Sequence, residues 1–353
     1  MGSCCANTTQ EKDSFTAITA PIQQISNENL EVKEPLKIKE SNETPSSPRR
    51  SEKNDEENYV SIKSYRGKLI ENTNYRYLMN NVHLLQQYII LQVFMLRIKG
   101  PFPFPIIKDQ TLTYAGPVQI DEGSIYMGQW SDGKRHGFGK QLYNYGSIYE
   151  GEWYNDQQQG YGRIVLSNGD YYEGQWKNDR AWGKGKYVTI DGTTYNGDWV
   201  DDKQQGRGVE EWKNGQRYEG NYLNGQKTGY GIFYWPDDSK YEGGLLDGMP
   251  HGNGEYTWKD GKKYKGEWMF NQMHGYGVYI WPDGKTYKGN FEKDQREGYG
   301  ELDWADGRIY KGNWKQGKQH GEGSFIYKNK IRKGVWQNGQ PTKWGQSEIL
   351  SSQ

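Results

Sequence analysis

The residues that could do chemistry recur at one spacing. Four of the five histidines directly precede the first glycine of a Gly-x-Gly pair, namely His136, His251, His274 and His320. A catalytic histidine would be singular, whereas this position holds glutamine, tryptophan, threonine or glutamate in the other copies. We therefore interpret these histidines as structural or surface residues.

The Gly-x-Gly pairs themselves could cradle a phosphate. A strand pattern follows each pair instead of a helix, however, and the Lys-Ser or Lys-Thr of a P-loop is absent. No pair of carboxylates stands apart as a candidate acid and base. We predict that the chain is not an enzyme, with no catalytic residue, no metal site and no cofactor.

The sequence MGSCCANTTQ at the start resembles an acylation signal. Gly2 would be exposed after loss of Met1, and the two cysteines of the chain, Cys4 and Cys5, lie beside it. The strict pattern has serine or threonine where Ala6 stands. One myristoyl chain binds membranes only marginally, with a constant of roughly 10⁴ M⁻¹, whereas a second chain makes the attachment stable. We predict lipidation at Gly2, Cys4 and Cys5; the alternative is a coincidental pair of cysteines.

Most of the chain is a repeat. The middle glycines of a Tyr-x-Gly-x-aromatic pattern lie 23 residues apart from Gly128 to Gly312, and Gly334 follows after 22. Gly-x-Gly pairs recur every 23 residues, from Gly137-x-Gly139 to Gly321-x-Gly323. Between them lie Asn-Gly or Asp-Gly dipeptides such as Asn168-Gly169, which suit two-residue hairpin turns with positive φ at both positions. Each unit is therefore predicted to be a strand, a short loop, a strand and a tight turn.

Alternate residues of a strand share one face, so the tyrosine, the glycine and the large aromatic project together. We predict that the glycine leaves a gap in which the rings lie flat and stack along the sheet. The core would then be an aromatic ladder made of Tyr126, Trp130, Tyr149, Trp153, Tyr172, Trp176, Tyr195, Trp199, Tyr218, Tyr222, Tyr264, Trp268, Tyr287, Phe291, Tyr310 and Trp314. A mean hydropathy of −1.09 with 15% aromatic residues fits such an array better than a layered globule.

The pattern resembles the MORN repeat (membrane occupation and recognition nexus) over about 116–339. Departures are the Tyr-Glu-Gly-Gly-Leu of 241–245 and Arg332 in place of a tyrosine. Gly116, 23 residues before Gly139, indicates half a degenerate repeat ahead of the first full one. The resemblance implies an all-β array, an elongated, twisted, single-layer antiparallel sheet of nine to ten hairpins, on the order of 90 Å long at about 4.8 Å per strand.

The segments outside the repeats differ in composition. Residues 7–58, after the acylation signal of 1–6, are rich in Ser, Asn and Glu and hold 7 Lys or Arg against 11 Asp or Glu, which predicts a disordered tether. Within 59–105, apolar residues from Leu78 to Leu96 at spacings of three and four predict an amphipathic helix, followed by a Pro-rich linker. The helix would cover part of the repeat sheet or bind a partner or a membrane surface. Residues 340–353 form the predicted C-terminal tail.

One repeat position changes its charge along the chain. The residue between the tyrosine and the glycine is acidic or neutral in the earlier units and then becomes Lys265, Lys288, Lys311 and Lys333. Residues 121–258 hold 14 Lys or Arg and 21 Asp or Glu, and residues 259–345 hold 17 and 10. We predict that this basic stripe binds an acidic partner, either a protein, an anionic lipid or membrane, or a second copy in a homodimer. The alternative is a solvated face without a role.

These features predict a non-enzymatic scaffold that organises protein partners and binds no nucleic acid. We expect it on the cytoplasmic face of a membrane, as a lipid-anchored protein that also binds phosphoinositides. The alternatives are a structural component of a cilium or flagellum resembling a radial spoke, a cortical cytoskeletal protein, and a regulatory subunit of a lipid kinase supplied in trans.

Overall fold

The computed structural model describes residues 102, 111–121 and 123–349, and they form strands and turns without a helix. No segment in this part of the chain is a helix that could span a membrane. The strands are β1 (Thr113–Gln119), β2 (Ile125–Ser131), β3 (Lys134–Leu142), β4 (Ile148–Tyr154), β5 (Gln157–Val165), β6 (Tyr171–Lys177), β7 (Arg180–Val188), β8 (Thr194–Val200), β9 (Lys203–Glu211), β10 (Arg217–Leu223), β11 (Gln226–Tyr234), β12 (Lys240–Leu246), β13 (Met249–Thr257), β14 (Lys263–Met269), β15 (Gln272–Ile280), β16 (Thr286–Glu292), β17 (Gln295–Asp303), β18 (Ile309–Lys315), β19 (Lys318–Tyr327), β20 (Lys330–Gln337) and β21 (Gln340–Ile349).

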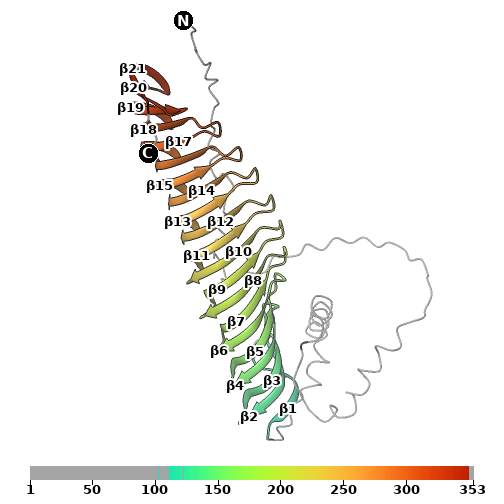
Figure 1. Ribbon diagram of the computed structural model, residues 1–353. Helices are drawn as coiled ribbons and strands as arrows, with labels where there is room; N and C mark the ends of the chain where they lie inside the picture. Colours follow the sequence, from blue (N-terminus) through green and yellow to red (C-terminus); the bar gives the residue numbers. More distant parts are fainter. Residues whose placement is uncertain (1–101, 103–110, 122, 350–353) are drawn as a thin grey trace, which may run out of the picture. The chain divides into compact units, whose positions relative to one another are not determined.

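The 21 strands belong to one open antiparallel sheet, which confirms the predicted fold class. Strands that follow one another in the sequence pair side by side, and their colours in Figure 1 accordingly run in chain order. By its contacts the sheet divides into two compact units. We call the one that ends at Gly206 the first unit, and the one that begins at Arg207, inside β9, the second unit. Each unit is described by itself below.

A β-bulge recurs from repeat to repeat, and the Gly-x-Gly pair explains it. Gly151 of β4 lies opposite Gly162 of β5, but the next pair, Trp153 and Gln158, is out of step by two residues. The extra residues on β5 include Gly160, which has a φ of +68°. The first glycine of each pair therefore makes the bulge, where positive φ favours glycine, and the second lies opposite the glycine of the neighbouring strand.

The two kinds of turn are exchanged relative to the prediction. Asn155 and Asp156, which follow the Tyr-x-Gly strand β4, have φ values of 47° and 70° and form the two-residue turn with positive φ at both positions. At the predicted site of that turn, only Gly169 of Asn168-Gly169 has a positive φ, and the backbone N–H of Gly169 donates to the carbonyl oxygen of Leu166 at 2.9 Å. This connection is a type I turn closed by a left-handed glycine, which explains why its asparagine needs no positive φ.

The irregular last spacing has the same origin. Between β19 and β20, Lys328 and Asn329 both have positive φ and form a two-residue turn, with Tyr327 opposite Lys330. In the preceding repeat, three residues separate the paired Trp304 and Arg308 at this connection. One residue is therefore lost from the loop, and the period falls from 23 to 22.

The aromatic rings do not stack flat on one another, and that prediction is wrong. The Tyr149 ring covers the paired glycines, such that a Cβ added to Gly162 would lie 2.3 Å from the Tyr149 hydroxyl oxygen. The Trp153 ring stands against it at 5.1 Å and 87°, and the Trp176 ring of the next repeat stands on its other side at 5.2 Å and 86°. The edge-to-face contact places the positive ring edge against the negative ring face, which aromatic pairs prefer over a flat sandwich.

Hydrogen bonds fix both ring types. In all nine repeats the tyrosine hydroxyl donates to the carbonyl oxygen three residues further on, as from Tyr149 to Glu152 at 3.0 Å. The indole N–H of Trp176 donates to the carbonyl oxygen of Gly162, 3.1 Å away in the preceding repeat. Buried tyrosine and tryptophan thus satisfy their polar atoms while linking successive hairpins.

A second row of rings lies on the ladder face of the second unit, and the sequence analysis missed it. It alternates strand residues with the tryptophans of the loops, at centroid distances of 4.4 to 5.7 Å, in the order Phe233, Trp235, Tyr256, Trp258, Tyr279 and Trp281. Leu302 takes the next strand position. The Trp-x-Asp/Asn-Gly pattern before each loop could have revealed this row.

The two ends of the sheet extend the repeat pattern imperfectly. At Gly116 the structure has a strand, β1, but Ala115 lies opposite Gly128 and the register shifts before Val118. The sheet continues beyond Gly339 into β21, within the segment assigned to the tail. The predicted acylation signal, tether and amphipathic helix lie outside the described residues.

Candidate binding surface

The ladder residues lie on one face of each unit. Fifteen of the sixteen are buried and Trp130 is half-buried. Tyr241 and Trp336, absent from the predicted set, belong to the same row: Tyr241 contacts Trp268 and Trp336 contacts Tyr310 through edge-to-face rings. Side chains that follow the two-residue turns also cover ladder rings. On β17, for example, the guanidinium of Arg296 lies 4.3 Å from the ring centroid of Trp314 on β18.

The opposite face carries the four lysines of the predicted stripe. Lys265 and Lys288 are exposed and lie opposite Val278 of β15, one on each side of it. The Lys311 ammonium is 2.9 Å from a Glu301 carboxylate oxygen, so its charge is compensated within the sheet, and this pairing raises the pKa of Lys311. Lys265 is only loosely paired, with 3.8 Å to Glu255.

In the first unit the same face holds a buried ion-pair cluster. Glu150, at the repeat position of the lysines, is 2% exposed and accepts from the Arg163 guanidinium at 2.8 Å and from Lys140 at 2.5 Å. The Phe102 ring lies over this cluster, 5.5 Å from the Arg163 guanidinium, and stacks on Tyr161 at 6.0 Å and 21°. Phe102 is 5% exposed.

An apolar cluster lies beside these charges in the first unit. It consists of Ile125, Leu142, Ile148, Val165 and Tyr171, all buried, with Val188 packed against them. Three of these residues directly precede a ladder tyrosine in the sequence and therefore project to the other face. The sequence analysis missed this cluster, although an apolar residue before each of the first three tyrosines was the available signal.

The second unit exposes aromatic side chains on this face. The middle residue of Gly-x-Gly is Tyr230, Tyr276 or Tyr299 in three repeats, and these side chains are 52, 57 and 60% exposed. The Tyr230 hydroxyl donates to Glu242 on the adjacent strand. These exposed rings form a set of contact points at one repeat position, with Tyr276 two strands from Tyr299 and four strands from Tyr230.

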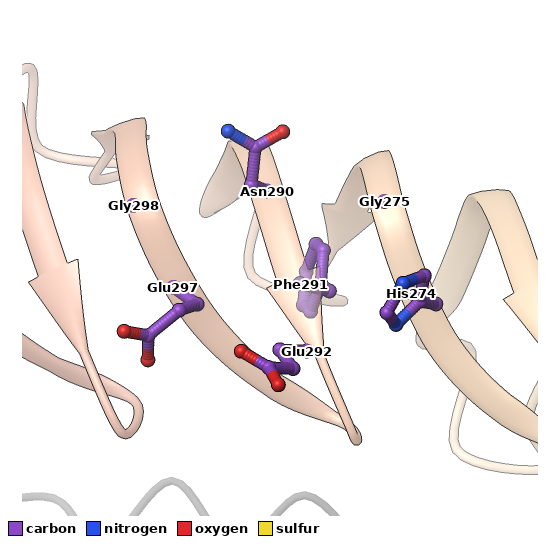
Figure 2. Close-up of a pocket in the computed structure, with 7 residues that line it drawn as sticks. All are labelled: His274, Gly275, Asn290, Phe291, Glu292, Glu297 and Gly298. Atoms are coloured by element: carbon purple, nitrogen blue, oxygen red, sulfur yellow. The ribbon is translucent and has the colours of Figure 1, made fainter.

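A shallow hollow of about 260 Å³ lies near the two-residue turns of the second unit. Figure 2 shows His274 and Gly275 on one strand, Asn290, Phe291 and Glu292 on the next, and Glu297 and Gly298 on the third. One Glu297 oxygen accepts from the backbone N–H of Gln316 at 2.8 Å. No group of three potential metal ligands occurs among the residues that the structure describes.

Burial shifts the titration of several groups. Desolvation raises the pKa values of Tyr149, Tyr172, Tyr218, Tyr264 and Tyr287 well above the usual value of 10.0. Burial likewise raises the pKa of Asp294, although its oxygen accepts from the Met273 backbone N–H at 2.8 Å. These shifts belong to packed structural positions and not to a cleft.

The repeat geometry agrees with a family comparison. The MORN repeat matches nine consecutive segments, at 126–147, 149–171, 172–194, 195–217, 218–240, 241–263, 264–286, 287–307 and 310–332, which together cover more than half of the chain. The chain belongs to the MORN-repeat family. MORN repeats indicate a repeat scaffold that binds proteins or membranes, and their all-β fold is typically non-catalytic.

Two solved structures match the chain at low similarity. One is the TCP domain of SAS-4 (dCPAP) from Drosophila melanogaster in complex with a proline-rich motif of Ana2 (dSTIL), with a TM-score of 0.30, 16% identity, and coverage of 54% of this chain and 97% of that one. The other is a streptogramin B lyase structure, with a TM-score of 0.13, 16% identity, and coverage of 70% and 86%. No curated protein sequence matches the chain significantly.

Proposed function

We propose that the chain is a non-catalytic MORN scaffold that holds protein partners on the face opposite its aromatic ladder. The observation that carries this proposal is the difference between the two faces of the second unit, one of which is packed with rings while the other exposes them. Ring packing and the tryptophan hydrogen bonds concentrate cohesion on the ladder face. The other face of the second unit keeps Tyr230, Tyr276 and Tyr299 more than half exposed. Aromatic residues are enriched at the centres of protein interfaces.

The proposal includes attachment to a membrane through acyl groups on Gly2 and on Cys4 or Cys5. Residues 7–58 would then separate the acyl groups from the scaffold. A net deficit of basic residues in this segment, 7 against 11 acidic ones, leaves the acyl chains as the main source of membrane affinity.

Fractionation of cell lysates tests the attachment. The wild type should sediment with membranes and be released by detergent, whereas Gly2→Ala and the double change Cys4→Ser with Cys5→Ser should move to the soluble fraction. The matched control is Ser3→Ala, which leaves all three acyl positions intact. A wild type that stays soluble, or a Gly2→Ala variant that still sediments, would contradict the membrane part of the proposal.

A further inference from the structure

The first unit shows what the face opposite the ladder can accept. Phe102 lies 59 positions before Tyr161 in the sequence, yet its ring stacks on the Tyr161 ring and comes within reach of the Arg163 guanidinium. Val165, two residues further along β5, is 5% exposed. One strand of this sheet therefore holds an aromatic side chain from a separate segment. We call the three positions of Tyr161, Arg163 and Val165, and their equivalents on other strands, a seat.

At the same three positions on β15 of the second unit, the outer two side chains are exposed and the middle one is half-buried. Tyr276, Val278 and Ile280 occupy the repeat positions of Tyr161, Arg163 and Val165. The exposed fraction is 57% for Tyr276 and 40% for Ile280. Among the residues that the structure describes, no aromatic ring covers this strip of apolar side chains.

The charges around the two seats are inverted. Arg163 lies between two glutamates, because the residues opposite it on the neighbouring strands are Glu150 on β4 and Glu173 on β6. Val278 lies between two lysines, because the corresponding partners are Lys265 on β14 and Lys288 on β16. In the first unit the charges compensate one another, whereas at β15 the two ammonium groups face an uncharged strand.

The positive charge of the strip is only partly compensated. Lys265 has its nearest carboxylate oxygen, that of Glu255, at 3.8 Å, and Lys288 lies opposite Glu301 of β17 without forming an ion pair among the described residues. Lys263, opposite Ile280, is also exposed. An occupant of this seat must supply negative charge on both sides of an apolar or aromatic group.

We propose, building on the scaffold function above, that the β15 strip binds an extended acidic segment of a protein partner, with an aromatic side chain seated on Tyr276 and carboxylates beside Lys265 and Lys288. The carboxylates of Glu255 and Glu301 lie on either side of the strip and disfavour the broad approach of an anionic bilayer. A narrow segment along β15 meets each lysine from the side of Val278, whereas Glu255 and Glu301 lie on the far side of the lysines.

Fluorescence anisotropy with a labelled peptide tests the proposal. The probe is Glu-Glu-Pro-Phe-Pro-Glu-Glu, patterned on Pro101-Phe102-Pro103 with acidic ends, and the comparison peptide has lysine in place of each glutamate. The full chain should bind the acidic peptide saturably and at least tenfold more tightly than the basic one. The double change Lys265→Glu with Lys288→Glu should weaken binding at least tenfold, and Tyr276→Ser should weaken it about fivefold, with unchanged circular dichroism.

The matched control is Lys315→Glu with Lys330→Glu, which makes the same change in net charge at exposed positions away from the strip and should leave binding unchanged. Equal binding of the two peptides, or equal weakening by the control, would overturn the proposal. The proposal would also be overturned if the peptide did not bind, while vesicles containing phosphatidylserine bound the wild type and did not bind the Lys265/Lys288 variant. Membrane fractionation separates the two proposals, because a lack of peptide binding by a protein that still sediments with membranes removes only the inference about β15.

Discussion

The indole N–H of Trp176 donates a hydrogen bond to the carbonyl oxygen of Gly162, 3.1 Å away, across the boundary between two repeats. The same bond recurs from Trp153 to Gly139 and from Trp314 to Gly300. Each tryptophan thus combines ring contacts to two tyrosines with a polar link to the preceding hairpin. This arrangement explains how a single layer of strands with few aliphatic residues gains cohesion.

Removing that bond should destabilise the first unit measurably. Trp176→Phe keeps a ring but leaves the Gly162 carbonyl without its donor, so we expect a loss of about 1 to 2 kcal/mol in the free energy of unfolding. Trp176→Ala should lose about 3 to 5 kcal/mol. Urea denaturation followed by circular dichroism measures both. Phe291 shows that a phenyl ring fits this repeat position; a Trp176→Phe variant as stable as the wild type would remove the role assigned to the bond.

The second glycine of Gly-x-Gly should tolerate no side chain. A Cβ on Gly254 would lie 2.4 Å from the Tyr241 hydroxyl oxygen and 2.7 Å from ring carbons. Because a rigid ring cannot move aside cheaply, Gly254→Ala should cost about 1 to 3 kcal/mol. The neighbouring exposed Asn253 gives the control, since Asn253→Ala should stay within about 0.5 kcal/mol of the wild type. Equal effects of the two changes, read from urea midpoints, would contradict the ring-over-glycine contact.

Much of this fold could be predicted from the sequence, because strand side chains alternate and the period of 23 fixes which residues meet. The choice between two turn types could not, since Asn-Gly suits a two-residue turn as well as a left-handed glycine after a type I turn. The alternative turn often lacks glycine, as at Asn155-Asp156, so composition did not reveal it. The two glycines of Gly-x-Gly also look alike in sequence, although one makes a bulge and the other makes room for a ring.

Less of the candidate surface was foreseen. The position of the lysines on the face opposite the ladder follows from strand alternation. The pairing of Lys311 with Glu301, by contrast, depends on the register of neighbouring strands. The seat of Phe102 on Tyr161 joins segments far apart in the chain, and no local pattern encodes such a contact.

The turn geometry predicts a stabilising change. Lys293 holds a φ of 49° in the two-residue turn between β16 and β17, where a side chain is costly. Lys293→Gly should therefore raise the free energy of unfolding by about 0.5 to 1 kcal/mol, because glycine adopts this conformation without strain. Lys315→Gly, at the exposed last position of β18, should not raise it, because glycine gains no relief from strain there. Thermal melting of both variants measures the difference, and a destabilised Lys293→Gly would contradict the assigned turn.

The buried tyrosines predict a cooperative loss of structure in alkali. Their pKa values are raised in the folded state above the usual 10.0, so their contribution to stability is complete below pH 10 and is lost as the pH rises above it. Each such tyrosine costs about 1.4 kcal/mol per pH unit in that range. Tyrosinate absorbance at 295 nm and far-ultraviolet circular dichroism should change together, just above pH 10. Tyrosines that ionise gradually around pH 10 while the circular dichroism persists would contradict their burial.

The most direct test of the account compares two rings only eight residues apart in the second unit. Trp268, 2% exposed, lies on the ladder face, and Tyr276, 57% exposed, lies on the other. Urea denaturation of Trp268→Ala and Tyr276→Ser should give a loss of about 3 to 5 kcal/mol for the first and at most about 0.5 kcal/mol for the second. A loss of stability in Tyr276→Ser as large as that in Trp268→Ala would contradict the claim that one face holds the sheet together and leaves the other for binding.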